Sequence, residues 1–331
     1  MENEKNTTAL LYPLRFAPIL KQRVWGGEKF SYNNGEVQGP IGESWEISGL
    51  EGNISVVTNG ELAGRNLNDL IEEHQHALVG QHVYKEFENT FPLLFKFIDA
   101  EKDLSVQLHP DDILAKKRHN SFGKTEMWYI IEAEENANLI LGFNQHIDKK
   151  AYQTHLNSKQ IKEILNFVPV SKGDAYLIHA GLVHAICKGI FLAEVQQTSD
   201  ITYRIYDWDR LGVSGKPRTL HTALAYEAID FEQRNSRLTY SEKQNEVVNL
   251  CAIRYFTTNK LFVTEQVCRD LNSIDSFVVY MCVEGSGKVI LDDKTEQIKQ
   301  GETVLIPACA KDVKLEGEKF GVLEVYIPKQ V

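Results

Sequence analysis

Two side chains that carry metal-binding atoms, Gln107 and His109, stand two residues apart in the segment Leu104-Ser-Val-Gln-Leu-His109. Apolar and polar residues alternate strictly in this segment, which predicts a β-strand with one apolar and one polar face. Gln107 and His109 would then project together, and an amide oxygen and an imidazole nitrogen could bind one metal ion. The pair alone is also compatible with an ordinary polar strand face, so a metal site would need further ligands.

Two other segments could supply those ligands. In Gly123-Lys-Thr-Glu126, Lys124 and Glu126 would share one strand face and bring a carboxylate and a cation into the same cavity, although a solvated ion pair is the alternative. His184 follows a glycine-bounded turn in apolar surroundings, where a histidine is commonly a hydrogen-bonded core residue. The combination is a mixed nitrogen and oxygen set that suits zinc and leaves manganese, iron and cobalt open. Its members are Gln107, His109, Glu126 and His184.

Residues 194–210 are dense in groups that suit a polyhydroxylated anion. Arg204 and Arg210 could hold phosphate oxygens or a developing oxyanion, because a guanidinium presents a fixed fork of donors. The alternative is that Asp207, Asp209 and Arg210 form a surface turn with ordinary ion pairs.

The elements that must position these residues are mainly strands. Glycine and turn residues recur roughly every 8 to 15 residues and separate short runs rich in Val, Ile, Tyr and Phe, which predicts an all-β sandwich or barrel. Helical periodicity is confined to insertions at about residues 64–89, 110–120, 148–167 and 217–230. Within these, Asn157–Phe167 and Pro217–Ile229 are each expected to form a helix.

An internal repeat predicts two related β domains. Residues 173–184 align without a gap with residues 301–312, and in both copies a glycine and an acidic residue lead into an apolar strand. Asp312 stands where the first copy has His184, so only the first copy is expected to bind metal. We place the domains at residues 1–235 and 236–331, because the chain is polar just after residue 235. Chance likeness between two turns is the alternative.

Composition excludes several classes of function. The chain has 331 residues, of which 43% are hydrophobic and 25% charged, so it is long enough to fold without a structural metal. A net charge of -10 with no basic run argues against nucleic acid as a partner. Met1–Thr8 lacks the apolar core of a signal peptide, and no segment reaches the roughly 18 apolar residues of a membrane span, so we expect a cytoplasmic protein without membrane contact. Five cysteines without a CxxC spacing predict neither disulfides nor a cysteine zinc site.

These motifs together resemble the type I mannose-6-phosphate isomerases of the cupin superfamily, and closely resemble their shorter bacterial form. The resemblance covers roughly residues 12–225, and the remainder fits a second, degenerate cupin. It implies an all-β fold with helical insertions, built from two jelly-roll barrels. The segments that carry it are Arg23-Val-Trp-Gly-Gly27, Gly42-Glu-Ser-Trp-Glu-Ile-Ser48, Leu104–Asp112, Gly123–Glu126 and Gly181–Arg210.

The resemblance also implies roles for individual residues. Arg204 and Glu194 match active-site positions, and three residues match positions that hold the phosphate end of the substrate: Ser105, Lys124 and Arg210. The four proposed ligands would bind one zinc ion per chain: Gln107, His109, Glu126 and His184. The sequence departs from the cupin pattern at His179, where a proline is usual, and we do not count this histidine as a ligand.

The implied reaction interconverts mannose 6-phosphate and fructose 6-phosphate through a cis-enediol or enediolate. We expect Glu194, near Arg204 and zinc, or a zinc-bound water to move the proton. Alternatives are a cupin metalloenzyme acting on another sugar phosphate, an iron-dependent oxygenase, and a sugar-sensing cupin without catalysis. A small sugar phosphate is the expected partner, and the resemblance favours a monomer or a weak homodimer.

Overall fold

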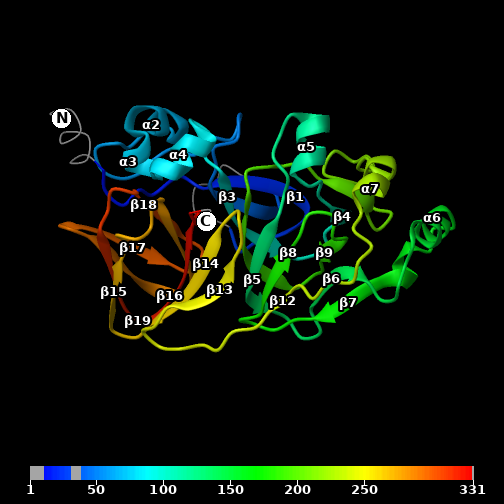
Figure 1. Cartoon of the computed structure of the whole chain (residues 1–331). Coiled ribbons are helices and arrows are strands. Elements are labelled where there is room, and N and C mark those ends of the chain that lie inside the picture. The colour runs from blue at the N-terminus through cyan, green and yellow to red at the C-terminus, as the bar shows by residue number, and fades with distance from the viewer. Residues whose placement is uncertain (1–10, 31–38, 330–331) are drawn as a thin grey trace. The chain divides into compact units, whose positions relative to one another are not determined.

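Strands dominate the computed structural model of the chain, which describes residues 11–30 and 39–329 (Figure 1). Short helices interrupt the strands, so the expected all-β fold with helical insertions is confirmed. Met1–Thr8, on which the expectation about a signal peptide rested, lies outside the described residues. No helix in the described part of the chain is long and apolar enough to cross a membrane.

The chain divides into two compact units that differ from a simple division at residue 235. One unit, here called the site unit, contains residues 20–45 and 95–237. The other, here called the C-terminal unit, contains residues 1–19, 46–94 and 238–331. The last boundary falls close to the predicted one, but residues 46–94 group with the C-terminal residues. The domain limits read from the sequence therefore stay a prediction.

Two sheets build the site unit. The larger has seven strands in the order β1 (Ile19–Gly27), β2 (Ile41–Ile47), β3 (Leu93–Ala100), β10 (Ile190–Gln197), β5 (Glu126–Ala133), β8 (Ala175–Ile178) and β12 (Arg237–Leu238). The smaller has five strands in the order β11 (Tyr203–Tyr206), β4 (Val106–Leu108), β9 (His184–Ile186), β6 (Asn138–Phe143) and β7 (Leu165–Pro169).

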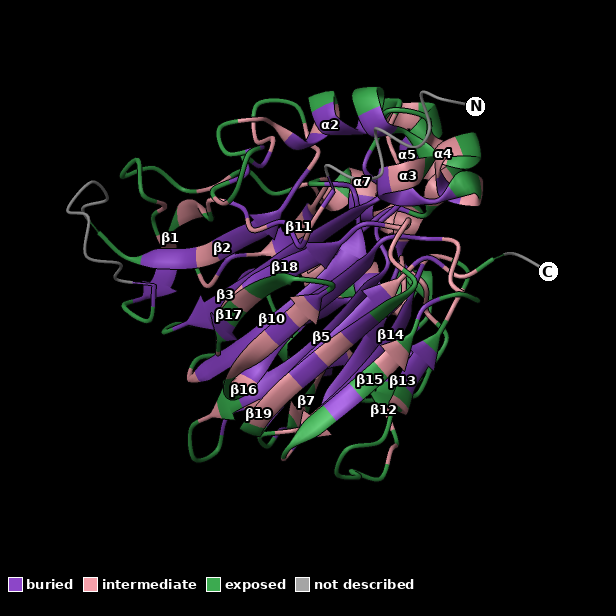
Figure 2. Ribbon diagram, turned by 90° about the vertical axis from the view of Figure 1, so that its left-hand side faces the viewer, coloured by how far each residue is buried: buried purple, intermediate pink, exposed green. Residues whose placement is uncertain are grey.

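A shared apolar layer lies between the two sheets. Trp128 and Ile130 of β5 belong to the same buried cluster as Leu139 of β6 and Ile186 of β9. Figure 2 shows β10 and β5 buried over much of their length. Because side chains alternate along a strand, the other residues of each strand must face away from this layer.

The outer face of the smaller sheet packs against helices. Val106 and Leu108 of β4 join a second buried cluster with Tyr152 of α6 (Lys149–Asn157) and Ala225 of α7 (Thr222–Ala228). Gln107 lies between these two apolar residues and so faces the opposite way, toward the layer between the sheets. A further helix of the site unit, α5 (Asp112–His119), begins at an Asp111 cap that accepts a hydrogen bond from the Leu114 amide.

Two helix predictions in the site unit need correction. The helix expected over 157–167 is wrong, since α6 ends at Asn157 and is followed by a 3₁₀ turn (Ile161–Ile164) and by β7. Ile161 and Ile164 are three residues apart, which fits one face of a 3₁₀ turn, and Leu165–Pro169 pairs with β6 instead of extending a helix. The helix expected from Pro217 begins only at Thr222, because Pro217 bridges to Leu211 within a loop.

The described residues of the C-terminal unit form one sheet and three short helices. Its main strands follow the order β13 (Val248–Ala252), β14 (Thr257–Val263), β19 (Asp312–Tyr326), β16 (Val278–Leu291) and β17 (Lys294–Lys299), with β15 (Gln266–Asp270) paired to β19 and β18 (Thr303–Ile306) paired to β16. Figure 1 shows its helices, α2 (Leu67–His74), α3 (His76–Val79) and α4 (Gln81–Phe87), near β18. The Ala308 amide, just after β18, donates to the Leu78 carbonyl.

The internal repeat has the same local structure in both units. Gly173 and Gly301 have φ angles of +90° and +87°, in the left-handed region that favours glycine. Each is followed by a four-residue strand that begins two residues later, β8 or β18. The next strand begins eleven residues after the glycine in both copies, at His184 in β9 and at Asp312 in β19.

Candidate metal centre

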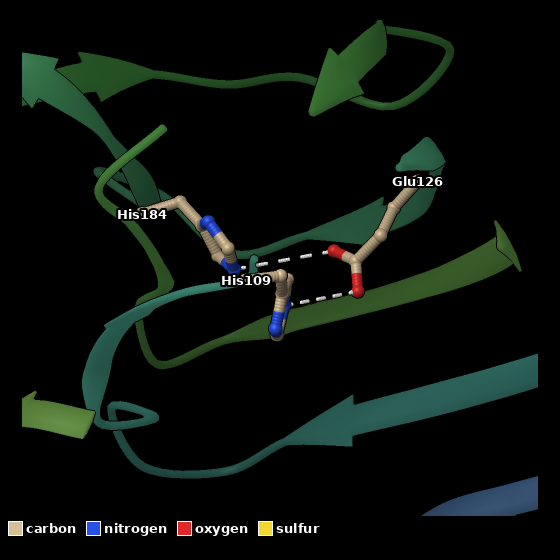
Figure 3. A group of neighbouring side chains, drawn as sticks. All are labelled: His109, Glu126 and His184. Carbon is tan, nitrogen blue, oxygen red and sulfur yellow. Dashed lines mark ion pairs between the residues drawn. The ribbon is translucent and has the colours of Figure 1, made fainter. Parts of the chain in front are cut away.

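Three buried side chains from three strands converge at one end of the layer between the sheets. His109 directly follows β4, Glu126 is the first residue of β5, and His184 is the first residue of β9. Figure 3 shows the three side chains pointing toward one another. One potential ligand atom from each lies within 4.8 Å of the others. The Glu126 carboxylate is 3.2 Å from His109 Nε2 and 4.0 Å from His184 Nε2.

The strand alternation explains why these groups meet. Glu126 shares its face of β5 with Trp128 and Ile130, and His184 shares its face of β9 with Ile186. Trp128, Ile130 and Ile186 belong to the apolar layer between the sheets. Glu126 and His184 therefore face the same space, at one end of that layer. The ring of Trp128 also packs edge-on against that of His184, with centroids 5.4 Å apart.

Hydrogen bonds fix both imidazole rings. His109 Nδ1 donates to the Ile201 carbonyl and His184 Nδ1 donates to the Leu182 carbonyl, each at 2.8 Å. This tautomer leaves Nε2 of each ring unprotonated and facing Glu126, as in many metal sites where the second ring nitrogen is held by a carbonyl.

The site contains buried polar atoms that lack hydrogen-bond partners within the described residues. They are both carboxylate oxygens of Glu126 and Nε2 of His184. Lys124 Nζ forms an ion pair with Glu126 Oε1 at 2.7 Å. Buried polar atoms without partners are costly, and two imidazole nitrogens with a carboxylate are ligands that suit a divalent transition metal. These residues therefore fit a metal ion.

The protonation states also favour metal binding. Burial, with the nearby charge of Lys124, lowers the pKa of His109 to about 4, and burial lowers the pKa of His184. Burial alone would raise the pKa of Glu126, but the charges of Lys124 and His109 outweigh it and hold this pKa well below its ordinary value. At neutral pH the site thus presents neutral imidazoles and an ionised carboxylate, the forms that bind metals.

Gln107 lies beside this group in the sheet. It pairs with His184 across β4 and β9, and with Arg204 across β4 and β11. Its Oε1 accepts a hydrogen bond from the Ser105 hydroxyl at 3.1 Å. The backbone register therefore brings Gln107 to the site, while its role as a fourth ligand stays a prediction.

Arg204 is tied to the same strand through Ser105. Its Nε donates to the Ser105 hydroxyl at 3.1 Å, and its Nη1 donates to the Thr219 carbonyl at 2.9 Å. Burial, together with the charge of Arg218, lowers the pKa of Arg204, which still leaves a guanidinium charged at neutral pH. A fixed positive charge thus stands next to the proposed ligands.

Glu194 has partners that the sequence did not indicate. Its two oxygens accept hydrogen bonds from Lys96 Nζ at 2.9 Å and from Trp128 Nε1 at 2.8 Å, and among the described residues it forms no hydrogen bond or ion pair with Arg204. Glu194 therefore forms a buried ion pair with Lys96, and its expected proximity to Arg204 stays a prediction. The signal for Lys96 was a single lysine inside the apolar run Leu93–Ile98, which is buried throughout.

Lys124 and Arg210, both expected at the phosphate end, lie with different partners. Lys124 contacts Glu126 and lies 3.4 Å from His109 Nε2, so it belongs to the candidate metal centre. Arg210 forms an ion pair with Asp207 at 3.1 Å. Within the described residues the candidate metal-binding group is His109, Glu126 and His184, and the exclusion of His179 as a ligand stays a prediction.

This arrangement suits chemistry on adjacent oxygen atoms of a small polar substrate. A metal ion held by His109, Glu126 and His184 would polarise substrate oxygens, and the cations of Lys124 and Arg204 would stabilise negative charge that develops on them.

Comparisons with known proteins agree with this description. Residues 14–152 match the family model of the phosphomannose isomerase type I catalytic domain, and residues 246–326 match the model of the mannose-6-phosphate isomerase cupin domain. The chain is 36% identical over 313 residues to the mannose-6-phosphate isomerase ManA of Bacillus subtilis, which covers 92% of this chain and 96% of that protein. It is 30% identical over 310 residues to the mannose-6-phosphate isomerase of Streptococcus mutans, with coverage of 92% and 96%.

Solved structures give the same result. The crystal structure of the mannose 6-phosphate isomerase from Bacillus subtilis superposes with a TM-score of 0.85 at 33% identity, covering 95% of this chain and 99% of that one. A phosphomannose isomerase from Salmonella typhimurium, at 17% identity and a TM-score of 0.75, shares the fold. The expected architecture of two cupin barrels is confirmed by these matches.

Proposed function

The chain belongs to the type I phosphomannose isomerase family and is an isomerase, and on this basis we propose that it interconverts mannose 6-phosphate and fructose 6-phosphate with one zinc ion per chain. The observation that carries the proposal is the buried group of His109, Glu126 and His184, whose potential ligand atoms lie within 4.8 Å of one another. We further propose Gln107 as the fourth ligand, because its strand pairs directly with that of His184.

Zinc, when bound, would supply a positive charge that stabilises an enediolate and holds substrate O1 and O2 on the same side. The side chains that surround the site add to this effect. The ammonium of Lys124, 2.7 Å from Glu126, stays protonated, because the charges of Glu126 and Glu194 outweigh burial and raise its pKa. Together with Arg204, it would favour the charged intermediate over the neutral sugar.

Isomerisation also requires removal of the C2 proton and its return at C1. Glu194 is our proposed proton carrier, and the hydrogen bonds from Lys96 and Trp128 hold its carboxylate in one orientation. Replacing it by glutamine keeps the shape of the side chain and removes the base. Glu194→Gln should therefore slow exchange of the C2 proton with deuterated water at least a hundredfold. Undiminished exchange in a folded variant would remove Glu194 from this role.

The experiment that tests the function is a coupled assay of fructose 6-phosphate formed from mannose 6-phosphate. It is run on the protein as purified, after chelation, and after addition of zinc, manganese, iron or cobalt. We expect activity to disappear with the chelator and to return best with zinc. If the folded, zinc-loaded protein does not convert mannose 6-phosphate, other aldose phosphates become the candidates for its substrate.

A further inference from the structure

His221, the residue just before α7, binds the backbone of Arg204 twice and has no role in the function described so far. The Arg204 amide donates to His221 Nδ1 at 3.2 Å, and the His221 amide donates to the Arg204 carbonyl at 2.7 Å. A third hydrogen bond runs from Arg204 Nη1 to the carbonyl of Thr219 at 2.9 Å. The segment that leads into α7 therefore holds both the backbone and the side chain of Arg204.

Arg204 needs such a partner because its strand lies at the edge of a sheet. β11 is an outer strand of the five-stranded sheet, and among the described residues it pairs with β4 alone. In an antiparallel pair the amide and carbonyl of every second residue point away from the partner strand, and at a sheet edge they have no strand to bind. His221 satisfies both of these groups of Arg204. It thus continues the ladder by one residue, with a ring nitrogen in place of a backbone carbonyl.

The strand is also irregular at this point. Its pairing with β4 shifts by one residue between Arg204 and Tyr206, so Ile205 is an extra residue that forms a β-bulge. A bulge bends a strand and changes the direction in which the neighbouring side chains point. The ladder with β4 therefore fixes Arg204 less firmly than it would in a regular strand, and the hydrogen bonds to His221 add the missing constraint.

The imidazole of His221 is in the form that can accept this hydrogen bond. Burial, together with the charge of Arg204, lowers the pKa of His221, so the ring is neutral at pH 7. Because Nδ1 accepts the Arg204 amide, the ring proton must lie on Nε2. His221 is the N-cap residue of α7, but its side chain makes no capping hydrogen bond to the helix. Its acceptor nitrogen is used for Arg204 instead.

The orientation of Arg204 matters because its side chain reaches the candidate metal centre. Nε of Arg204 donates to the Ser105 hydroxyl at 3.1 Å, and that hydroxyl donates to Gln107, the proposed fourth ligand, at 3.1 Å. A cation stabilises a developing negative charge only where it is held in place, and a displacement of about 1 Å can slow a reaction roughly a hundredfold. A residue that holds Arg204 from behind would thus affect the reaction without touching the substrate.

We propose that His221 is a positioning residue of the isomerase, and that its Nδ1 holds the Arg204 amide so that the guanidinium stays oriented toward the reacting oxygens. This inference rests on the proposed function for the role of Arg204 and deepens it by naming the group that orients this arginine. The alternative is a purely structural role, because the ring of His221 also faces that of Tyr203, with centroids 6.5 Å apart.

Two variants separate hydrogen bonding from packing in the zinc-loaded, full-length enzyme. His221→Phe keeps an aromatic ring against Tyr203 and removes the acceptor, whereas His221→Asn removes the ring and keeps an acceptor, Oδ1, close to the position of Nδ1. We expect kcat to fall about tenfold in His221→Phe, which corresponds to one lost hydrogen bond. KM should change less than about twofold, because Arg204 acts on charge that develops during the reaction. The kcat of His221→Asn should stay within about threefold of wild type.

Two further variants complete the kinetic test. His155→Phe is the matched control, because His155 Nδ1 bonds the Ala151 carbonyl at 2.8 Å within α6, and its kcat should equal that of wild type. If His221 acts through Arg204, adding His221→Phe to Arg204→Ala should lower kcat no further. An equal further loss in this double variant, or equal losses in His221→Phe and His221→Asn, would overturn the inference.

Hydrogen exchange separates this inference from the proposed function, because it does not depend on turnover. The Arg204 amide should exchange with deuterated water about tenfold faster in His221→Phe than in wild type or His221→Asn, while the amides of the central strand β9 stay protected. Faster exchange supports the inference even if the wild-type protein isomerises a different sugar phosphate, on which the kinetic comparison is then repeated. Unchanged exchange in a folded His221→Phe variant, or an unchanged kcat, would overturn the inference while leaving the isomerase activity intact.

Discussion

At the scale of single residues, the two histidines His184 and His179 provide a matched pair. They are five residues apart, but only His184 has a ring nitrogen that faces Glu126 without a hydrogen-bond partner among the described residues. His184→Ala should therefore lose bound zinc and at least a thousandfold in kcat/KM, whereas His179→Ala should keep both. Metal analysis and steady-state kinetics measure the two effects.

The fold should survive the His184→Ala substitution. The imidazole is buried against Trp128 and His109, so its loss leaves a small cavity, worth roughly 2 to 3 kcal/mol. A cooperative urea unfolding transition at slightly lower concentration is the expected result. Complete unfolding of this variant would show that the metal centre is needed for the structure, contrary to our view of the site.

Glu43 makes the stability of the fold depend on pH. It accepts hydrogen bonds from Arg23 Nε at 2.8 Å and from Trp45 Nε1 at 2.7 Å. Burial would raise the pKa of Glu43, but the charges of Lys96 and Arg23 outweigh it and lower the pKa to about 2. Because the folded-state pKa lies below the unfolded one, the resulting stability is present above pH 4.5 and is lost as the pH falls toward 2.

The variant Glu43→Gln removes this pH-dependent contribution. At pH 7 it should be less stable than wild type by up to about 3 kcal/mol, and the difference should shrink as the pH falls from 5 to 3. Urea unfolding of both proteins across that range gives the comparison. A difference that stayed constant with pH would mean that the charge of Glu43 does not stabilise the fold.

At the scale of elements, the two copies of the internal repeat can be compared at the positions of the proposed metal ligands. Glu126 pairs with Ile178, and Val278 pairs with Ile306, where each isoleucine is the fifth residue after the repeat glycine. Val278 therefore occupies the position of the proposed metal ligand Glu126. The C-terminal unit lacks this carboxylate ligand as well as the histidine that Asp312 replaces.

A buried glutamate is nevertheless present in both copies. Glu194 pairs with Trp128 in one sheet, and Glu324 pairs with Tyr280 in the other. In each pair the aromatic side chain donates to the glutamate at 2.8 Å. A glutamate at this position can thus stabilise the fold without a neighbouring metal site. The proton-exchange experiment on Glu194 is therefore needed to establish that this residue takes part in catalysis.

Glu324 allows the structural role to be tested alone. It is fully buried and forms a bidentate pair with Arg269, at 2.7 Å and 2.8 Å. Glu324→Gln leaves a partly buried guanidinium without its counter-charge, which should cost about 3 kcal/mol of unfolding free energy. Chemical denaturation measures this, and Glu316→Gln, at an exposed pair with Lys288, is the control that should leave the midpoint unchanged. The kcat of folded Glu324→Gln should equal that of wild type.

The sequence predicted most elements of the site because their patterns are local. The alternation in residues 104–109 predicted that Gln107 faces inward. The repeat that begins at Gly173 predicted where His184 lies relative to the preceding strand. The prediction of an α-helix over 157–167 was wrong because a three-residue spacing of apolar residues fits both an α-helix and a 3₁₀ turn. Pairing with β6 makes the residues that follow the turn a strand. The partners of Glu194 could not be predicted, because Lys96 lies 98 residues away in the chain and only the sheet register joins them.

At the scale of the whole molecule, the sequence indicated two β domains but not how the chain is shared between the compact units. Residues 46–94 group with the C-terminal unit because α3 bonds to segments around residues 277 and 308, which are distant in sequence. Such pairing depends on backbone hydrogen bonds that no side-chain pattern encodes. The cytoplasmic location and the monomer or weak homodimer stay predictions.

Removal of the metal should separate function from folding at the level of the whole chain. Both units have extensive apolar cores that do not include the metal ligands, so neither depends on zinc to fold. A metal that binds only the folded state still adds stability, by about 2.7 kcal/mol when its free concentration is a hundred times its dissociation constant. The chelated protein should therefore keep its circular dichroism spectrum and unfold a few degrees lower than the zinc-loaded protein.

The variant His184→Ala makes this prediction specific, because it lacks one ligand but keeps both cores. Its unfolding temperature should be the same with zinc and with a chelator, while that of His179→Ala should shift as the wild type does. An equal zinc-dependent shift in His184→Ala would place the stabilising ion elsewhere in the protein. Loss of the circular dichroism spectrum on chelation of the wild type would instead make zinc part of the fold, and the metal centre would then have a structural role in addition to its proposed part in isomerisation.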